Sequence, residues 1–181
     1  MLAEEGYVGV ALDIFGVKTK LEGFEDYRRQ TSFLYKNRRE FWKRIKSGLI
    51  EARKILGNLK NQFIIGYCFG GATLLETARS GEEMTGFVSF HGGLKTTDGQ
   101  DYSETSGSIL ILHGSVDPVS GMDDVMNLVK ELNDFEIQHE VHIYGGVRHS
   151  FTIKGSRDYS ENAEKKSWVA LLNYLKQNSK I

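Results

Sequence analysis

Cys68 is the one cysteine of this 181-residue chain, and it stands in the segment GYCFGG directly after the apolar run 63–65. The pattern G-x-C-x-G is typical of a tight turn between a strand and a helix. Its glycines let the two elements approach, and its third residue projects at the carboxyl edge of a sheet. A helix that starts at Phe69 would aim unpaired amides at the sulfur and lower the pKa of the thiol. The pattern therefore predicts a nucleophilic cysteine.

Two other interpretations of this turn compete with the nucleophile. A cysteine without a disulfide partner is often a small buried apolar residue. A dinucleotide-binding loop is disfavoured, because its G-x-G-x-x-G pattern needs a glycine where this chain has Cys68.

A thiol nucleophile needs a general base, and the base needs an acid that orients it. Asp117, in LILHGSVDP, follows the apolar run 109–112, and His149, in YGGVRHSF, follows the last predicted strand. The order cysteine, aspartate, histidine is the chain order of the α/β-hydrolases. Taken alone, Asp117 is equally a turn-forming residue before Pro118, and His149 equally a loop histidine. Their shared position after strand ends favours a catalytic set.

Four short apolar runs predict strands that would position these residues: 63–65, 86–90, 109–112 and 141–144. Apolar residues at helical spacing predict helices over 69–80, 122–135 and 161–176. Short strands that alternate with helices indicate a parallel sheet covered on both faces. The predicted fold class is therefore α/β, in a single domain over residues 1–181.

The N-terminal part is harder to interpret. Residues 2–5 have the pattern of a last helical turn with Gly6 as its C-cap, and residues 7–12 have that of a buried strand. Apolar residues recur every three or four positions over 41–59, which predicts a helix. Basic residues dominate the stretch 36–54. Nucleic-acid binding is one explanation, but a solvated helix face is favoured, because basic and aromatic residues do not alternate elsewhere.

Composition excludes several classes of protein. The net charge is −1, which gives no field to attract nucleic acid or an anionic membrane. No apolar stretch approaches the roughly 20 residues of a transmembrane helix, and one cysteine cannot form an intramolecular disulfide. The N-terminus has no signal-peptide pattern. We expect a cytoplasmic protein whose partner is a small molecule.

The other histidines carry weaker signals. His139 and His142 are three positions apart on a predicted strand, so they face opposite sides and cannot share a metal. His91 and His113 each end a strand at the same edge as Cys68, where they either support the pocket or are simply buried. No set of residues has zinc-site spacing, and we expect no metal.

Several blocks of the sequence resemble the dienelactone hydrolase family, in that family's order. They are GYVGVALDIFG, GYCFGG, FHGGL, LHGSVDP, HSFT and the late KKSW, with Leu12 where a proline is common. The resemblance implies an α/β-hydrolase fold in which Cys68 is the nucleophile, His149 the base and Asp117 its orienting partner. It also implies cleavage of small esters or lactones through an acyl-enzyme, without a cofactor.

The resemblance also exposes a difference. Family members have an additional N-terminal segment that supplies the first strands, part of the oxyanion hole and a glutamate near the cysteine. One explanation is that the sequence is a truncated reading of a longer enzyme, and the other is a genuine short form that is weakly active or inactive. The alternative function is that of a non-catalytic binding domain. An unpaired sheet edge would favour self-association. The amide of Phe69 would supply one oxyanion donor.

Four residues are predicted to contact the transition state or the substrate because they adjoin the catalytic set in sequence. They are Phe69, Arg148, Ser150 and Phe151. The guanidinium of Arg148 would suit a substrate carboxylate. The alternative is an arginine that only faces solvent.

Overall fold

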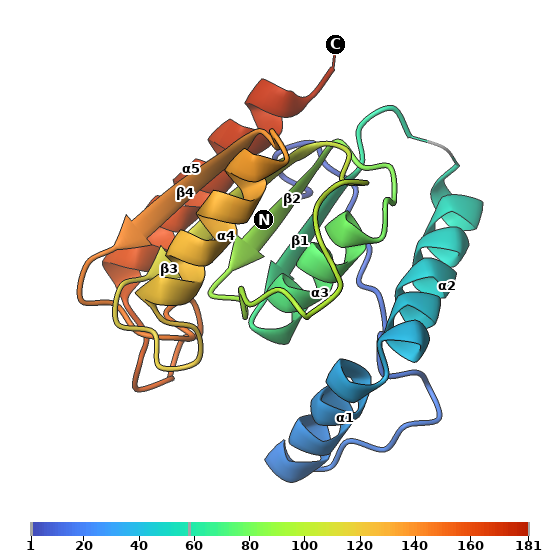
Figure 1. Ribbon diagram of the computed structural model, residues 1–181, viewed down its shortest axis with the longest axis horizontal. Coiled ribbons are helices and arrows are strands. Elements are labelled where there is room, and N and C mark those ends of the chain that lie inside the picture. The colour runs from blue at the N-terminus through green and yellow to red at the C-terminus, as the bar shows by residue number, and fades with distance from the viewer. Residues whose placement is uncertain (1, 58, 181) are drawn as a thin grey trace. The chain divides into compact units, whose positions relative to one another are not determined.

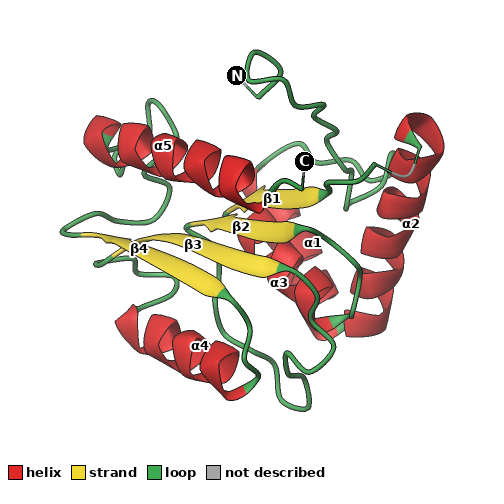
Figure 2. Ribbon diagram, turned by 90° about the horizontal axis from the view of Figure 1, so that it is seen from above, coloured by secondary structure: helices red, strands yellow, loops and turns green. Residues whose placement is uncertain are grey.

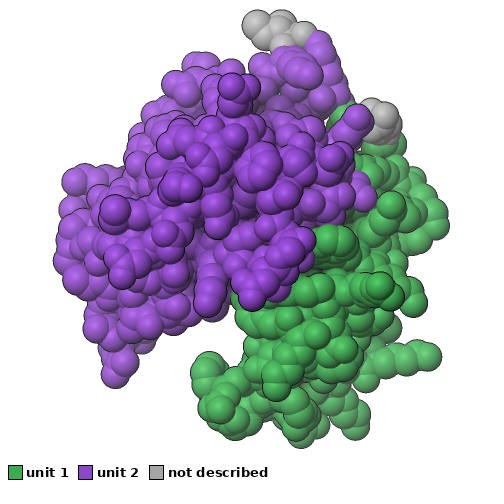
Figure 3. Space-filling model, viewed as in Figure 1, with its two compact units in different colours: residues 1–59 green, residues 60–181 purple. Residues whose placement is uncertain are grey.

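The computed structural model describes residues 2–57 and 59–180. The chain divides into two compact units, Met1–Leu59 and Lys60–Ile181, which Figure 3 distinguishes by colour. The expectation of a single domain over residues 1–181 stays a prediction.

The Lys60–Ile181 unit is built on a parallel four-stranded sheet (Figure 1). Its strands are β1 (Phe63–Tyr67), β2 (Gly86–Phe90), β3 (Ser108–Gly114) and β4 (His139–Tyr144), and they pair in chain order. All four lie where the apolar runs predicted them. Strands β2 and β3 are buried along their whole length. Strands β1 and β4 are partly exposed, as expected for the two edges of a sheet.

Three helices cover this sheet. They are α3 (Phe69–Arg79), α4 (Met122–Asp134) and α5 (Glu161–Asn178). Figure 2 shows α5 on one face of the sheet and both α3 and α4 on the other. The hydroxyl of Ser160 caps α5 by accepting a hydrogen bond from the amide of Ala163. The predicted α/β class is therefore confirmed, with helix ends within two residues of the sequence prediction.

The Met1–Leu59 unit contains two helices, α1 (Phe24–Lys36) and α2 (Arg38–Leu56). The buried residues of α2 are Phe41, Ile45 and Leu49, which follow the predicted four-residue spacing. The helix ends before the predicted residue 59, because Gly57 takes a positive φ of 75°. The sequence did not predict α1, which buries only Leu34 and leaves its other apolar side chains more exposed.

The predicted strand at residues 7–12 is wrong. These residues form no regular secondary structure, and Val8 and Val10 are 67% and 43% exposed. No described strand pairs with this segment, and an apolar stretch becomes a strand only when a neighbour accepts its backbone hydrogen bonds. Residues 2–5 form a hydrogen-bonded turn that ends at Gly6, which has a φ of 84°.

None of the helices within the described parts of the chain has the length and apolarity to cross a bilayer.

Candidate active site

The turn that carries Cys68 joins β1 directly to α3. Cys68 has φ 54° and ψ −115°, a backbone conformation that residues other than glycine rarely adopt. A Cβ atom on Gly66 would lie 2.1 Å from the carbonyl oxygen of Gly70, so only glycine fits there. The amide of Cys68 donates to the carbonyl of Phe90, which ties the turn to β2 at 3.0 Å. The glycine pattern therefore produces the tight turn between strand and helix that the sequence predicted, and the backbone of Cys68 is strained in it.

The structure brings the three predicted residues together in one hydrogen-bonded series. His149 Nδ1 lies 2.8 Å from Asp117 Oδ2, and His149 Nε2 lies 3.2 Å from Cys68 Sγ. Because the carboxylate accepts from Nδ1–H, the other ring nitrogen is left to face the sulfur. Asp117 and His149 are buried, whereas Cys68 is open to solvent. The arrangement suits transfer of a proton between the thiol and the imidazole.

Both carboxylate oxygens of Asp117 accept hydrogen bonds. Its Oδ1 accepts hydrogen bonds from the amides of Val119 at 2.8 Å and Ser120 at 3.3 Å, while Oδ2 faces His149. The side chain thus forms the turn around Pro118 and also orients the imidazole. The turn and the hydrogen bond to the imidazole are compatible, because each uses a different oxygen, and the catalytic role of Asp117 stays a prediction.

The electrostatics favour a charged thiolate and imidazolium. The hydrogen bond from His149, assisted by the imidazolium charge and by the amide of Phe69, lowers the pKa of Cys68 against the opposing effect of burial. Burial by itself would lower the pKa of His149, but the hydrogen bonds and charges of Asp117 and Cys68 raise it to about 9. Burial would also raise the pKa of Asp117, yet the hydrogen bonds from His149 and Val119 hold it below its ordinary value.

Two further histidines lie at this edge of the sheet, as the sequence indicated, and both are fully buried. His113 Nε2 lies 2.8 Å from the carbonyl oxygen of Ser120, in the loop that carries Asp117. His91 Nε2 lies 2.9 Å from the hydroxyl of Thr152, in the loop that carries His149. Thr152 is a residue that sequence reasoning missed, and only its place in the block HSFT pointed to it.

The residues predicted to contact the substrate have different surroundings. Phe69 begins α3, and its amide reaches the sulfur of Cys68. Phe151 is fully buried and packs edge-to-face on His91, with ring centroids 5.2 Å apart. Ser150 adopts a φ of 60°.

Arg148 is engaged by a carboxylate of the protein. Its Nε donates to Asp158 Oδ1 at 3.0 Å, and its side chain is 45% exposed. A substrate carboxylate at Arg148 would therefore share the guanidinium with Asp158. The predicted substrate contacts of Arg148, Ser150 and Phe151 stay predictions.

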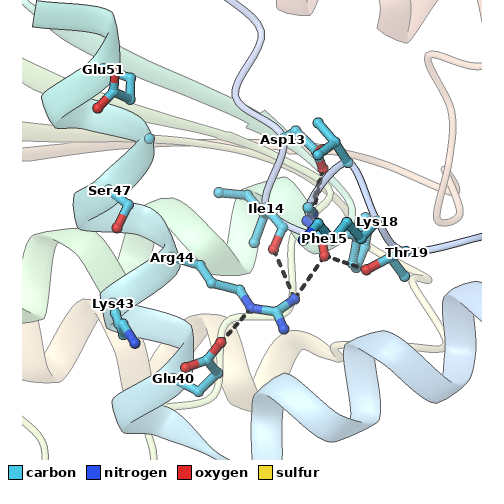
Figure 4. A pocket seen from close by; sticks show the side chains of 13 residues that line it. Asp13, Ile14, Phe15, Lys18, Thr19, Glu40, Lys43, Arg44, Ser47 and Glu51 are labelled. Carbon is cyan, nitrogen blue, oxygen red and sulfur yellow. Dashed lines mark hydrogen bonds and ion pairs between the residues drawn. The ribbon is translucent and has the colours of Figure 1, made fainter.

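A hollow of about 490 Å³ lies within the Met1–Leu59 unit, between residues 13–19 and α2 (Figure 4). Several of its polar groups bond to one another. Arg44 binds Glu40 at 2.8 Å and the carbonyl of Phe15 at 2.9 Å, and Asp13 accepts from the amides of Phe15 and Gly16. Its lining includes none of the three residues of the hydrogen-bonded series.

No group of three or more His, Cys, Asp or Glu side chains is arranged to hold a metal within residues 2–57 and 59–180. His139 bonds to the carbonyl of Ile137, and His142 bonds to Glu140. Both histidines of β4 therefore have local partners.

Comparison with known proteins adds evidence from outside the chain. The model of the dienelactone hydrolase family matches residues 1–179. An uncharacterized protein of Caenorhabditis elegans is 31% identical over 121 residues, which are 62% of this chain and 77% of that protein.

Solved structures agree with this match. A dienelactone hydrolase-like promiscuous phosphotriesterase from metagenomic libraries has a TM-score of 0.85 and 29% identity, over 97% of this chain and 77% of its own. An α/β-hydrolase enzyme from a Medee basin deep-sea metagenome library has a TM-score of 0.57 and 14% identity, over 89% of this chain and 67% of its own. The second likeness bears on the fold alone, which is that of an α/β-hydrolase.

Proposed function

The chain belongs to the dienelactone hydrolase family, and from this premise we propose that it hydrolyses small esters or lactones through an acyl-enzyme on Cys68. The family and the structural relatives support a hydrolase in general. The observation that carries the finer proposal is the position of His149, with one ring nitrogen 2.8 Å from Asp117 and the other 3.2 Å from Cys68.

In the first half-reaction the Cys68 thiolate attacks the carbonyl carbon of the ester, and the π electrons move to the carbonyl oxygen. In this proposal the amide of Phe69, at the start of α3, donates a hydrogen bond to that oxyanion. When the tetrahedral intermediate collapses, the C–O bond breaks and the departing alkoxide takes the proton from the His149 imidazolium. A lactone would open in the same step, with the alcohol still attached to the acyl group.

In the second half-reaction neutral His149 takes a proton from water, and the hydroxide attacks the thioester carbon. The C–S bond then breaks, the thiolate of Cys68 is restored, and the carboxylic acid leaves. Asp117 keeps Nδ1 protonated and stabilises the positive charge that His149 carries in between.

The structural relative suggests a second electrophile for the same thiolate. That protein is named a promiscuous phosphotriesterase and is 29% identical to this chain. A thiolate can attack phosphorus as well as a carbonyl carbon, so a phosphotriester belongs among the substrates tested.

The test is the turnover of p-nitrophenyl acetate and of a p-nitrophenyl phosphotriester by the wild-type chain and by Cys68→Ala. We expect ester turnover to fall by about 10⁴-fold or more, because the nucleophile is lost. The control is His142→Gln, a change on the edge strand β4 at a side chain that is 36% exposed, which should keep wild-type turnover. Unchanged ester turnover in Cys68→Ala would remove the proposal.

The rate at which iodoacetamide alkylates Cys68 distinguishes the enzyme from a non-catalytic binding domain of the same fold. A thiolate paired with His149 should react at neutral pH much faster than an ordinary thiol. A rate equal to that of a free cysteine would favour the binding domain.

A further inference from the structure

His91 is a fully buried histidine for which the proposed reaction has no step. It follows the last residue of β2 and takes a φ of 39°, a left-handed conformation that histidine tolerates better than most residues. Its amide donates to the carbonyl of Leu112 at 2.9 Å, which ties its backbone to β3. The backbone of His91 is thus tied to two central strands of the sheet.

The ring of His91 makes two contacts with the loop that carries the catalytic base. Its Nε2 lies 2.9 Å from Thr152 Oγ1, three residues beyond His149. Its ring also packs edge-to-face against the His149 imidazole, with centroids 5.0 Å apart and an interplanar angle of 65°. One contact joins His91 to a side chain of that loop, and the other packs against the His149 ring itself.

We propose that His91 is a positioning residue, which through Thr152 and its own ring holds the His149 imidazole in the orientation that reaches Cys68. This proposal rests on the proposed function only for its ester readout. The orientation of His149 toward the sulfur is also measurable through the thiol itself.

His91 acts through packing and hydrogen bonding, because it carries no charge near neutral pH. Burial and the charge of His149 lower its pKa to about 4, with Asp117 and His113 as the other ionisable groups that act on it. A neutral ring beside the His149 imidazolium avoids the repulsion that a second positive charge would cause.

The experiment uses the full chain with His91→Asn, Thr152→Val and the double variant. Asparagine tolerates the left-handed backbone but is too short to repeat both contacts of the imidazole. Valine keeps the shape of threonine and removes the hydroxyl. His142→Gln is the control, because it changes a histidine at the exposed edge of the same sheet. The pH dependence of Cys68 alkylation by iodoacetamide and the kcat and KM for p-nitrophenyl acetate are measured for each.

We expect both single variants to raise the pH at which alkylation is half-maximal and to lower kcat about three- to tenfold, which is the worth of one hydrogen bond, with KM within about twofold. The loss in the double variant should be smaller than the product of the single losses, since the hydrogen bond between His91 and Thr152 is lost in either single variant. If His91→Asn fails to fold, Thr152→Val decides alone.

Two results would overturn the proposal. One is a wild-type alkylation profile in folded Thr152→Val, because a purely structural residue would leave the thiol pKa unchanged. The other is a double variant whose loss equals the product of the single losses. A wild-type chain that turns over no ester would instead count against the proposed function, while the alkylation profiles would still test His91.

Discussion

Two segments lie at the same edge of the sheet but are held in different ways: residues 66–70 around Cys68, the cysteine turn, and residues 145–160 around His149, the histidine loop. Cys68 is positioned by backbone atoms, since a Cβ on Gly66 would overlap the backbone of Gly70 where strand and helix meet. His149 is positioned by side chains from elsewhere in the chain, namely Asp117 and His91. Local sterics can be inferred from a short stretch of sequence, whereas a side-chain contact across 32 or 58 positions cannot.

The largest effect should come from breaking the side-chain control of the histidine loop. In Asp117→Asn the amide oxygen would take the place that accepts from Val119 and Ser120, which turns the NH₂ group toward His149. Nδ1 must then accept a hydrogen bond, so Nε2 carries the proton and cannot act as base. We expect kcat to fall by about 10³- to 10⁴-fold with folding retained, measured by ester turnover and thermal unfolding. Loss of less than about tenfold would argue against Asp117 as the orienting acid.

Gly66→Ala should disrupt the backbone of the cysteine turn, and Gly70→Ala is its matched control. In Gly66→Ala the new Cβ would overlap the backbone of Gly70, and we expect the free energy of unfolding to fall by about 3 kcal/mol or more. Gly70→Ala meets nothing within 4 Å and lies in α3, where alanine is favoured by about 0.5–1 kcal/mol. Urea unfolding of both variants checks the pair. Equal stabilities would show that the close approach at Gly66 is not needed.

The pH dependence of turnover tests the hydrogen bond between Cys68 and His149, where the cysteine turn and the histidine loop meet. The lowered pKa of Cys68 and the His149 pKa of about 9 predict a bell-shaped kcat/KM. Turnover should rise as Cys68 loses its proton, below the ordinary thiol pKa, and fall near pH 9 as His149 loses the proton needed by the leaving group. In His149→Asn the pH of half-maximal Cys68 alkylation should move up toward the ordinary value of about 8.5. An unmoved midpoint would mean that His149 does not stabilise the thiolate.

The smallest effect concerns the one strained residue of the histidine loop. Ser150 takes a φ of 60°, so Ser150→Val should lower the free energy of unfolding by about 1–2 kcal/mol. Ser150→Gly should change it by less than about 1 kcal/mol, because relief of strain is offset by a more flexible unfolded chain. Thermal unfolding of the two variants should rank valine as the less stable. The reverse ranking would contradict a strained backbone at this position.

Much of the fold followed from sequence pattern where the pattern was strong. The four strands of the Lys60–Ile181 unit and its three helices were predicted close to their observed bounds, because short buried strands between amphipathic helices leave few alternatives. The pattern failed in the Met1–Leu59 unit. The sequence did not predict α1, which buries only Leu34, and residues 7–12 have the composition of a strand although no strand among the described residues pairs with them.

The sequence by itself determined the elbow at Cys68 and the order of its two partners, because glycine sterics and strand–helix alternation act over a few residues. Only the tertiary structure decided that His149 lies 2.8 Å from Asp117 and 3.2 Å from Cys68. The hydrogen bond between His91 and Thr152 likewise depends on the tertiary structure. Such contacts join residues distant in sequence through side chains whose directions depend on the packing of the whole sheet.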